Sequence, residues 1–319
     1  MNGTAMNHPI DSSQAPHWRL PSSAEFAGAD DGKATLVLLH SSAGSARQWQ
    51  PTIQTLPPRF DVRTVEFHGH GARAAWSGSA SMTLDDEAAL VESLIEKVGG
   101  AHLVGHSYGG AVALKVATRR PNLVRSVAAY EPVLFSLLRD DPASRREIQS
   151  VVAVAEAMRE RLAEGQPLAA AQRFIDFWSG AGAWASLPSE RQTAFAIRMP
   201  PVVRQFDALF NDGLSLRDLA RLRLPLLLLS GGRTVPAARS ACNLAATAQP
   251  TAQVEMLDGM GHMGPITHAP AFNRRLIEFL DALPTSHAHH APSAQTGSLY
   301  PAPVRAGALS DAASAALPE

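Results

Sequence analysis

The chain has 319 residues, of which 45% are hydrophobic, and its 28 Lys and Arg residues nearly balance 29 Asp and Glu residues. A formal net charge of −1 argues against a nucleic-acid-binding protein, whose basic face normally shows in the totals. The single cysteine, Cys242, excludes an intrachain disulfide and a zinc site built from several cysteines.

No membrane or export signal is readable. The longest aliphatic run, Leu226 to Leu229, is far shorter than the roughly 20 apolar residues that a membrane-spanning helix needs. The first 20 residues lack the apolar stretch of a secretory signal. We therefore expect a cytoplasmic protein that does not bind membranes.

Both ends of the chain have the composition of disordered segments. Residues 1–17 show no hydrophobic periodicity, and residues 284–319 are rich in Ala, Ser, Pro and His. Such segments bury too little apolar surface to offset the entropy lost on ordering. We expect the folded part to span residues 18–283.

Short apolar runs alternate with helical patterns through this folded part. The runs that predict strands are Thr35–Leu39, Val62–Glu66, His102–Gly105, Val124–Tyr130, Leu224–Leu229 and Ala252–Leu257. The patterns that predict helices between them are Leu84–Val98, Tyr108–Arg120 and Ala269–Leu283. Strands that alternate with helices predict an α/β fold with a mostly parallel central sheet flanked by helices.

The alternation stops between about residues 133 and 219. This stretch contains only helical patterns, at Ala143–Glu164, Leu168–Trp178, Ser189–Met199 and Val202–Phe210. A helical cap inserted over the sheet explains it more simply than an independent domain.

A candidate nucleophile lies in the segment Gly105 to Gly110, whose Gly-His-Ser-Tyr-Gly sequence fits the Gly-x-Ser-x-Gly nucleophile elbow. An apolar strand ends at Gly105, and a helix begins just after Ser107. A sharp strand-to-helix turn strains the serine backbone, and the glycines on either side relieve crowding. The alternative is that Ser107 simply caps the helix.

The loop after the first strand, His40 to Ser45, resembles the α/β-hydrolase family, in which a strand ending in His-Gly-x precedes an oxyanion-hole loop. The resemblance implies that the backbone N–H groups of Ser42 and Tyr108 form the oxyanion hole. Ser41 stands where the family usually has glycine. The segment Phe67 to Gly71 resembles the family's Gly-His-Gly turn, and we expect it to be a structural turn rather than a metal site.

A serine hydroxyl needs a base to take its proton. His262 is the best candidate, because it lies in a glycine-rich loop, Asp258 to Gly264, where the family carries its catalytic histidine. His268 is the alternative.

The expected acid is missing from its usual place. Family members usually carry an Asp after the strand that ends here near Leu229, but Ser230 to Pro236 contains no carboxylate. Glu131 follows the preceding strand, where some relatives, including haloalkane dehalogenases, place their acid. We therefore predict Glu131 as the third member of the triad, with Asp258 and Asp212 as lesser candidates.

The predicted cap is rich in aromatic residues, and most of them could simply pack the cap helices together. Phe135, Trp178 and Phe206 are our candidates for substrate binding. If they face the cleft, they favour an apolar substrate over a sugar or a phosphate.

The sequence thus predicts a serine hydrolase that cleaves a small apolar carboxylic ester, thioester or lactone through an acyl-enzyme. The resemblance implies no cofactor and no metal. The same constellation also serves C–C bond hydrolases and lyases, and the displaced acid keeps a non-catalytic binding protein open. The sequence does not decide whether the chain forms a homo-oligomer.

Overall fold

A computed structural model describes residues 32–283, so the predictions for residues 1–17 and 284–319, and for residues 18–31 of the expected folded part, lie outside its range. Six strands form one sheet in the order β2-β1-β3-β4-β5-β6, and every neighbouring pair is parallel. The strands are β1 (Ala34–Leu39), β2 (Phe60–Val65), β3 (Ala101–His106), β4 (Val124–Tyr130), β5 (Leu226–Gly231) and β6 (Gln253–Leu257). The predicted parallel α/β sheet is confirmed.

Burial explains why the strands read as continuous apolar runs. Leu36 to Leu39 in β1 are completely buried, and Leu226 to Leu229 in β5 are at most 3% exposed. A strand covered on both faces has no solvent side on which to alternate polar residues. The edge strand β6 is different, because Val254 and Met256 are about half exposed.

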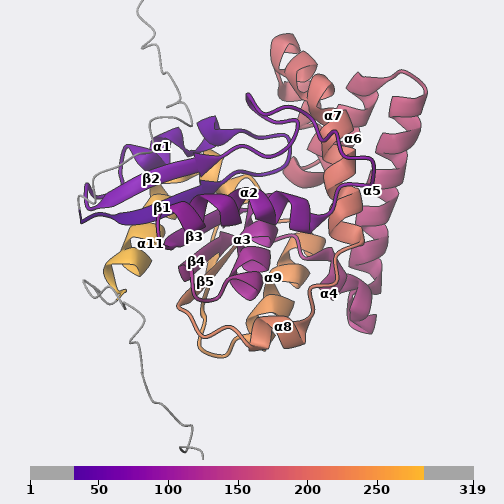
Figure 1. Ribbon diagram of the computed structural model, residues 1–319. Helices are drawn as coiled ribbons and strands as arrows, with labels where there is room; N and C mark the ends of the chain where they lie inside the picture. Colours follow the sequence, from indigo (N-terminus) through magenta and orange to yellow (C-terminus); the bar gives the residue numbers. More distant parts are fainter. Residues whose placement is uncertain (1–31, 284–319) are drawn as a thin grey trace, which may run out of the picture. The chain divides into compact units, whose positions relative to one another are not determined.

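Helices cover both faces of this sheet (Figure 1). One group is α2 (Leu84–Lys97), α3 (Tyr108–Arg119), α8 (Leu216–Ala220) and α9 (Pro236–Ala248), which contact one another in a row. The other group is α1 (Gln50–Ile53) and α11 (Ala269–Asp281), joined by a 2.8 Å hydrogen bond from Thr52 Oγ1 to Asn273 Oδ1. The short helix α10 (Gly264–Thr267) precedes α11. None of the helices within residues 32–283 is long and apolar enough to cross a membrane.

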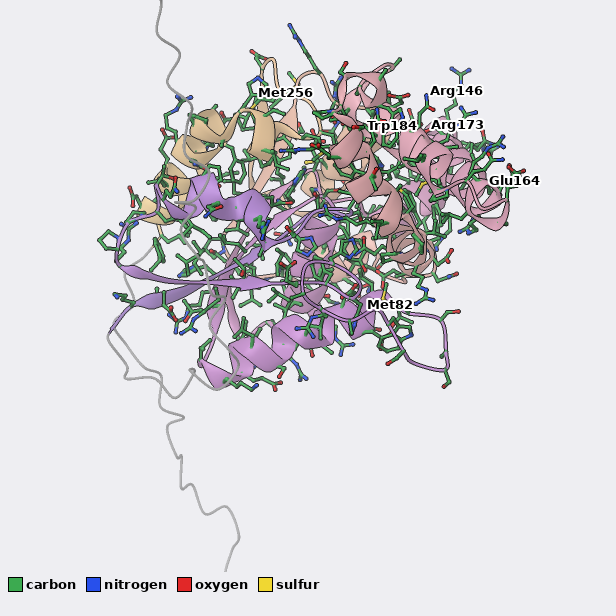
Figure 2. All side chains as sticks on the ribbon, turned by 90° about the horizontal axis from the view of Figure 1, so that it is seen from above. Met82, Arg146, Glu164, Arg173, Trp184 and Met256 are labelled. Carbon is green, nitrogen blue, oxygen red and sulfur yellow. The ribbon has the colours of Figure 1, made fainter. Side chains whose placement is uncertain are left out.

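Between β4 and β5 the chain forms helices, and those before α8 lie together beyond one end of the sheet (Figure 1). Before α8 they are α4 (Phe135–Asp140), α5 (Arg145–Ala163), α6 (Pro167–Ser179) and α7 (Ser189–Phe210). We call α5, α6 and α7 the cap. Figure 2 shows Arg146, Glu164 and Arg173 at the edge of the cap, and all three are exposed.

The prediction of two helices, 189–199 and 202–210, is wrong, because α7 continues through Pro200 and Pro201. Proline removes backbone donors but fixes φ near the helical value, so a helix can continue where packing supports it. Met199 and Val202, on either side of the prolines, are completely buried. Tertiary packing therefore outweighs the local break signal.

Helix α9 was absent from the sequence prediction. Its buried face consists of alanines and Cys242. Small side chains give a weak hydrophobic period, so the helix is recognisable mainly by what it packs against.

Parallel pairing brings the loops after the strands to one edge of the sheet. Leu39 of β1 pairs with Gly105 of β3, and His106 pairs with Tyr130 of β4. Tyr130 in turn pairs with Leu229 of β5. The loops that follow these residues are consequently neighbours, and they carry the candidate site.

Candidate active site

Ser107 lies at a strained turn between β3 and α3. Its φ of 56° and ψ of −114° are rare for a residue with a side chain. A Cβ atom on Gly105 would come within 2.3 Å of the Gly109 carbonyl oxygen, and one on Gly109 within 2.3 Å of the Leu39 carbonyl oxygen. Only glycine fits at these two positions, which explains the predicted elbow spacing.

Residues other than glycine with a positive φ angle are found in the loops after the strands, where the candidate site lies. Within residues 32–283 they occur at Ala43, Ser107 and Glu131, with φ of 57°, 56° and 47°. These residues follow β1, β3 and β4, respectively. Such conformations cost roughly 1–3 kcal/mol each and persist where the surrounding structure holds them, which is typical of functional sites.

Glu131, His262 and Ser107 form a hydrogen-bonded row. His262 Nδ1 lies 2.6 Å from Glu131 Oε2, and His262 Nε2 lies 2.9 Å from Ser107 Oγ. An ionised carboxylate only accepts, so Nδ1 carries the proton in the neutral ring and Nε2 is left to accept from the serine hydroxyl. All three residues are at most 5% exposed. The structure thus brings together the three residues predicted from three separate loops.

Two further donors hold the Glu131 carboxylate. The Gly231 N–H donates to Oε1 and the Thr234 hydroxyl donates to Oε2, both at 2.6 Å. Both donors belong to the segment Ser230–Pro236, which comprises the end of β5 and the following loop and lacks a carboxylate of its own. Sequence analysis assigned no role to Thr234. Three donors compensate the carboxylate for the loss of water around it.

The loop that carries His262 is held from two strands. Tyr130 donates its hydroxyl proton to the Gly261 carbonyl at 2.7 Å, and His106 Nε2 lies 2.8 Å from the His262 carbonyl oxygen. Burial lowers the pKa of His106 to about 3, and the neighbouring His262 contributes in the same direction. His106 is therefore neutral at physiological pH. An uncharged neighbour, 5.3 Å away between ring centroids, does not oppose a positive charge on the His262 ring.

Most backbone N–H groups in the loop after β1 are bonded. The Ser41 N–H donates to Gln48 Oε1 at 2.9 Å, the Ala43 N–H to His70 Nε2 at 3.2 Å, and the Gly44 N–H to the Ser41 carbonyl at 3.0 Å. The Ser42 N–H, by contrast, has no hydrogen-bond partner among the described residues, and the same is true of the Ser45 N–H at the end of the loop. The Tyr108 N–H, in the first turn of α3, also has no hydrogen-bond partner among the described residues.

The free Ser42 and Tyr108 donors lie in adjacent segments. The closeness of Gly109 to the Leu39 carbonyl places the start of α3 against the end of β1. Ser42 and Ser107 line one cavity. The arrangement therefore offers two unpaired backbone donors beside the serine hydroxyl, where negative charge would develop on an attacked carbonyl.

The turn at Phe67 to Gly71 supports this loop. His70 accepts from the Ala43 N–H through Nε2, and its Nδ1 lies 3.0 Å from the His68 carbonyl oxygen, which fixes the tautomer. From the cap, Arg198 donates to the Ala43 carbonyl at 2.8 Å. Sequence analysis expected a structural turn, and the structure adds that the turn holds the loop after β1.

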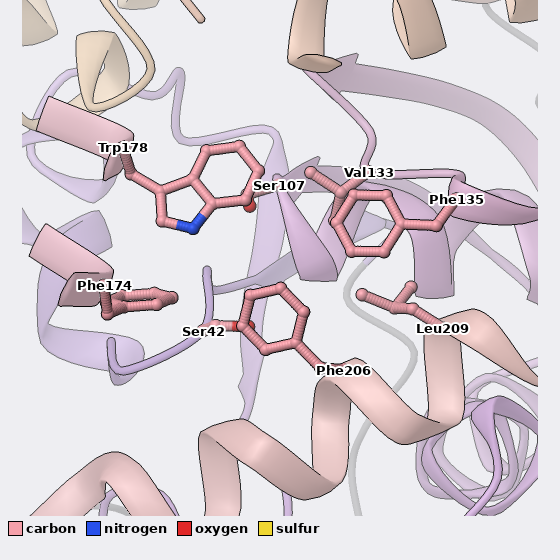
Figure 3. A pocket seen from close by; sticks show the side chains of 8 residues that line it. All are labelled: Ser42, Ser107, Val133, Phe135, Phe174, Trp178, Phe206 and Leu209. Atoms are coloured by element: carbon pink, nitrogen blue, oxygen red, sulfur yellow. The ribbon is translucent and has the colours of Figure 1, made fainter. Parts of the chain in front are cut away.

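The cavity beside Ser107 has mostly apolar walls. Figure 3 shows Phe174 and Trp178 from α6, and Phe206 and Leu209 from α7, gathered around Ser107 and Ser42. The remaining lining residues are Val133 and Phe135. All three predicted substrate-binding residues thus lie in this wall. The cavity measures about 10 Å³, which is room for roughly one water molecule.

Trp178 makes a contact that sequence reasoning missed. Its indole stacks on the His262 ring, with 4.4 Å between centroids and 30° between planes. The cap therefore covers one face of the imidazole. No local pattern could have shown this, since the two residues lie in an inserted helix and in the loop after the last strand.

The alternative site residues lie elsewhere. The His268 ring contacts the Thr267 hydroxyl on the surface at the start of α11. Asp212 forms a 2.6 Å ion pair with Lys115. Asp258 makes no hydrogen bond to His262, whose Nδ1 is taken by Glu131.

Comparisons with known proteins agree with this geometry. The model of the alpha/beta hydrolase family matches residues 36–275. A pimeloyl-[acyl-carrier protein] methyl ester esterase of Xanthomonas campestris is 30% identical over 264 residues, covering 78% of this chain and 96% of the relative. A protein assigned as the carbamate hydrolase RutD in Agrobacterium fabrum is 27% identical over 271 residues, covering 80% of this chain and 97% of the relative.

Solved structures share the fold at lower identity. The enol-lactonase of Burkholderia xenovorans superposes with a TM-score of 0.61 at 20% identity, covering 78% of this chain and 92% of the other. The α/β-hydrolase MGS-M2 from a deep-sea metagenome library superposes with a TM-score of 0.67 at 17% identity, covering 82% and 94%.

A parallel sheet with a serine at a strained elbow, beside a histidine and a carboxylate, defines the class of α/β-hydrolase-fold enzymes. The chain belongs to the alpha/beta hydrolase family, and it is a hydrolase.

Proposed function

We propose that this protein is a serine esterase that cleaves small apolar carboxylic esters, thioesters or lactones through an acyl-enzyme. The observation that carries the proposal is the buried row from Glu131 through His262 to Ser107, which ends at the wall of an apolar cavity. The family and its ester-cleaving relatives support the same reaction class.

In the acylation step, Ser107 Oγ attacks the carbonyl carbon of the ester while its proton passes to His262 Nε2. Glu131 holds the ring in the reactive tautomer and stabilises the imidazolium that forms. The carbonyl oxygen becomes negative and accepts hydrogen bonds from the Ser42 and Tyr108 N–H groups. The C–O bond to the leaving alcohol then breaks, and the alcohol takes the proton from Nε2.

Deacylation repeats these roles with water. His262 takes a proton from a water molecule that attacks the acyl carbon, and the second oxyanion uses the same two donors. When this intermediate collapses, Ser107 Oγ leaves with the proton from Nε2 and the carboxylic acid is released. Besides water and the ester, each step uses only groups of the hydrogen-bonded row, the loop after β1 and the start of α3.

The walls of the cavity support a small apolar acyl group. None of its lining residues is charged, and the polar ones are Ser42 and Ser107. A charged acyl group would lose its hydration there without a partner. With room for about one water molecule, the cavity must widen before it holds even a small acyl group.

Labelling with a fluorophosphonate and hydrolysis of p-nitrophenyl acetate test the proposal. We expect one covalent adduct, on Ser107, and ester hydrolysis that is lost together with the adduct in Ser107→Ala. The matched control is Ser126→Ala, since Ser126 is a buried serine of β4 whose hydroxyl contacts His102. Labelling at a serine other than 107, or an unreactive folded protein, would refute the proposal.

A further inference from the structure

Gln48 connects two loops of the site through both ends of its side-chain amide. It lies in a short 3₁₀ helix (Ala46–Trp49) that follows the loop from His40 to Ser45, which we call the oxyanion-side loop. Its Oε1 accepts from the Ser41 N–H at 2.9 Å and from the Ser41 hydroxyl at 3.0 Å. Its Nε2 lies 3.4 Å from Nδ1 of His106, the residue just before the nucleophile.

The direction of each hydrogen bond follows from the acceptors. The His262 carbonyl can only accept, so His106 Nε2 must carry the ring proton. The neutral His106 ring then has a lone pair on Nδ1, which accepts from the amide nitrogen of Gln48. This leaves the amide oxygen of Gln48 facing Ser41, where two donors meet it. One orientation of each side chain therefore satisfies all four contacts.

We infer that Gln48 and His106 act as positioning residues, tying the oxyanion-side loop to the elbow and to the loop that carries His262. The inference rests on the proposed function, since it explains how the loops of the proposed active site are held in position relative to one another. The connection runs from Ser41 through Gln48 and His106 to the His262 carbonyl. The 3.4 Å contact between Gln48 and His106 is its longest link.

The position of Gln48 controls the direction of the Ser42 N–H. The Ser41 N–H points to Gln48, and the next N–H but one, on Ala43, points to His70. Fixing the N–H groups on both sides leaves the Ser42 N–H between them free for an oxyanion. The space is tight, because a Cβ on Gly44 would lie 2.8 Å from Gln48 Oε1.

The test is Gln48→Met, which keeps the length of the side chain and removes both polar ends. We expect kcat for p-nitrophenyl acetate to fall about ten- to hundredfold with little change in KM, because a misdirected donor weakens only transition-state binding. His106→Phe should have a similar effect. If the two residues act as a unit, the double variant falls no further than the more impaired single variant.

Gln249→Met is the matched control. Gln249 is also buried, and its amide donates to the Leu219 and Leu222 carbonyls. It lies between α9 and β6, before the strand begins, whereas the site lies where the strands end. It should lower Tm and leave kcat unchanged. A fall in kcat no larger in Gln48→Met than in Gln249→Met, or fully additive losses in the double variant, would overturn the inference.

Amide hydrogen exchange separates this inference from the proposed function. Gln48→Met should speed exchange at the Ser41 N–H at least tenfold, while the Ala43 N–H on His70 changes less. This readout needs no substrate. If the wild-type protein is inactive but its Ser41 N–H exchanges slowly, and Gln48→Met speeds that exchange, the esterase proposal is refuted and the positioning role of Gln48 stands. If Gln48→Met leaves the exchange at Ser41 unchanged, the positioning role is refuted.

Discussion

Glu131 takes the place of a carboxylate that the Ser230–Pro236 loop does not have. The end of β5 and the loop after it supply donors instead, from the Gly231 N–H and the Thr234 hydroxyl. A carboxylate after β4 reaches the same imidazole nitrogen because β4 lies between β3 and β5 in the sheet.

Glu131→Gln tests the role of the acid. An amide is neutral and can present its NH₂ group to His262 Nδ1, which favours the wrong tautomer and removes the charge that stabilises the imidazolium. We expect kcat to fall by about 10³–10⁴ with the fold intact. Circular dichroism and Tm check the fold. An unchanged kcat would contradict the assignment of Glu131 as the acid of the triad.

Thr234→Val should have a smaller effect on the same group. It removes one of three donors to Glu131 and keeps the shape of the side chain. A hydrogen bond to a charged group contributes about 1.5–3 kcal/mol, so we expect at least a tenfold loss in kcat. Thr267→Val serves as control, because the Thr267 hydroxyl is exposed and bonds locally. Equal activity in both variants would contradict a role for Thr234.

At the scale of elements, α6 and α7 supply four of the eight residues that line the cavity beside Ser107. Phe206 stacks on Phe135, with 5.9 Å between centroids and 22° between planes, and meets Phe174 edge to face. These rings come from three different helices. Packing of the cap helices α6 and α7 against α4 therefore also forms the wall of the cavity beside Ser107, so the same aromatic residues pack the helices and line the cavity.

Phe206→Ala should enlarge the cavity beside Ser107. We expect the ratio of kcat/KM for p-nitrophenyl hexanoate to that for the acetate to rise about tenfold, since additional methylenes gain apolar contact. Phe210→Ala is the control, because Phe210 belongs to the same ring cluster but does not line the cavity. The same ratio in both variants would show that loosened packing, rather than cavity size, sets the preference.

At the scale of the whole molecule, Glu87 links stability to pH. It is a completely buried residue of α2, and its Oε1 has no hydrogen-bond partner in the described part of the chain. Burial raises its pKa from 4.5 to about 8, opposed by the His68 N–H and the nearby Gln205. The folded protein therefore keeps a proton that the unfolded chain releases near pH 4.5.

The sign follows from proton binding. Between pH 4.5 and about 8 the folded state binds more protons than the unfolded state, so the free energy of unfolding falls as pH rises, by about 1.4 kcal/mol per pH unit at most. Glu87→Gln should remove this fall in the free energy of unfolding. The free energy of unfolding of the variant minus that of the wild type should therefore increase from pH 5 to 8.

Urea unfolding at several pH values measures this difference. Glu96→Gln is the control, because Glu96 lies on the same helix, is half exposed and pairs with Arg120. It should parallel the wild type. A Glu87→Gln curve parallel to wild type across this range would show that Glu87 is ionised in the folded protein.

The sequence by itself determined the features that depend on local pattern. Apolar runs located all six strands, and the glycine spacing located the elbow, since steric crowding at Gly105 and Gly109 leaves a sequence signature. The position of Glu131 at the end of a strand also followed from order along the chain. These signals are local because they arise from backbone conformation and strand burial.

Only the tertiary structure decided which side chains meet. Thr234 on Glu131, Trp178 on His262 and Gln48 between two loops join residues far apart in the sequence. The continuity of α7 through its prolines likewise depends on its buried neighbours. Contacts of this kind come from the packing of elements against one another, and no period or motif within a single segment encodes them.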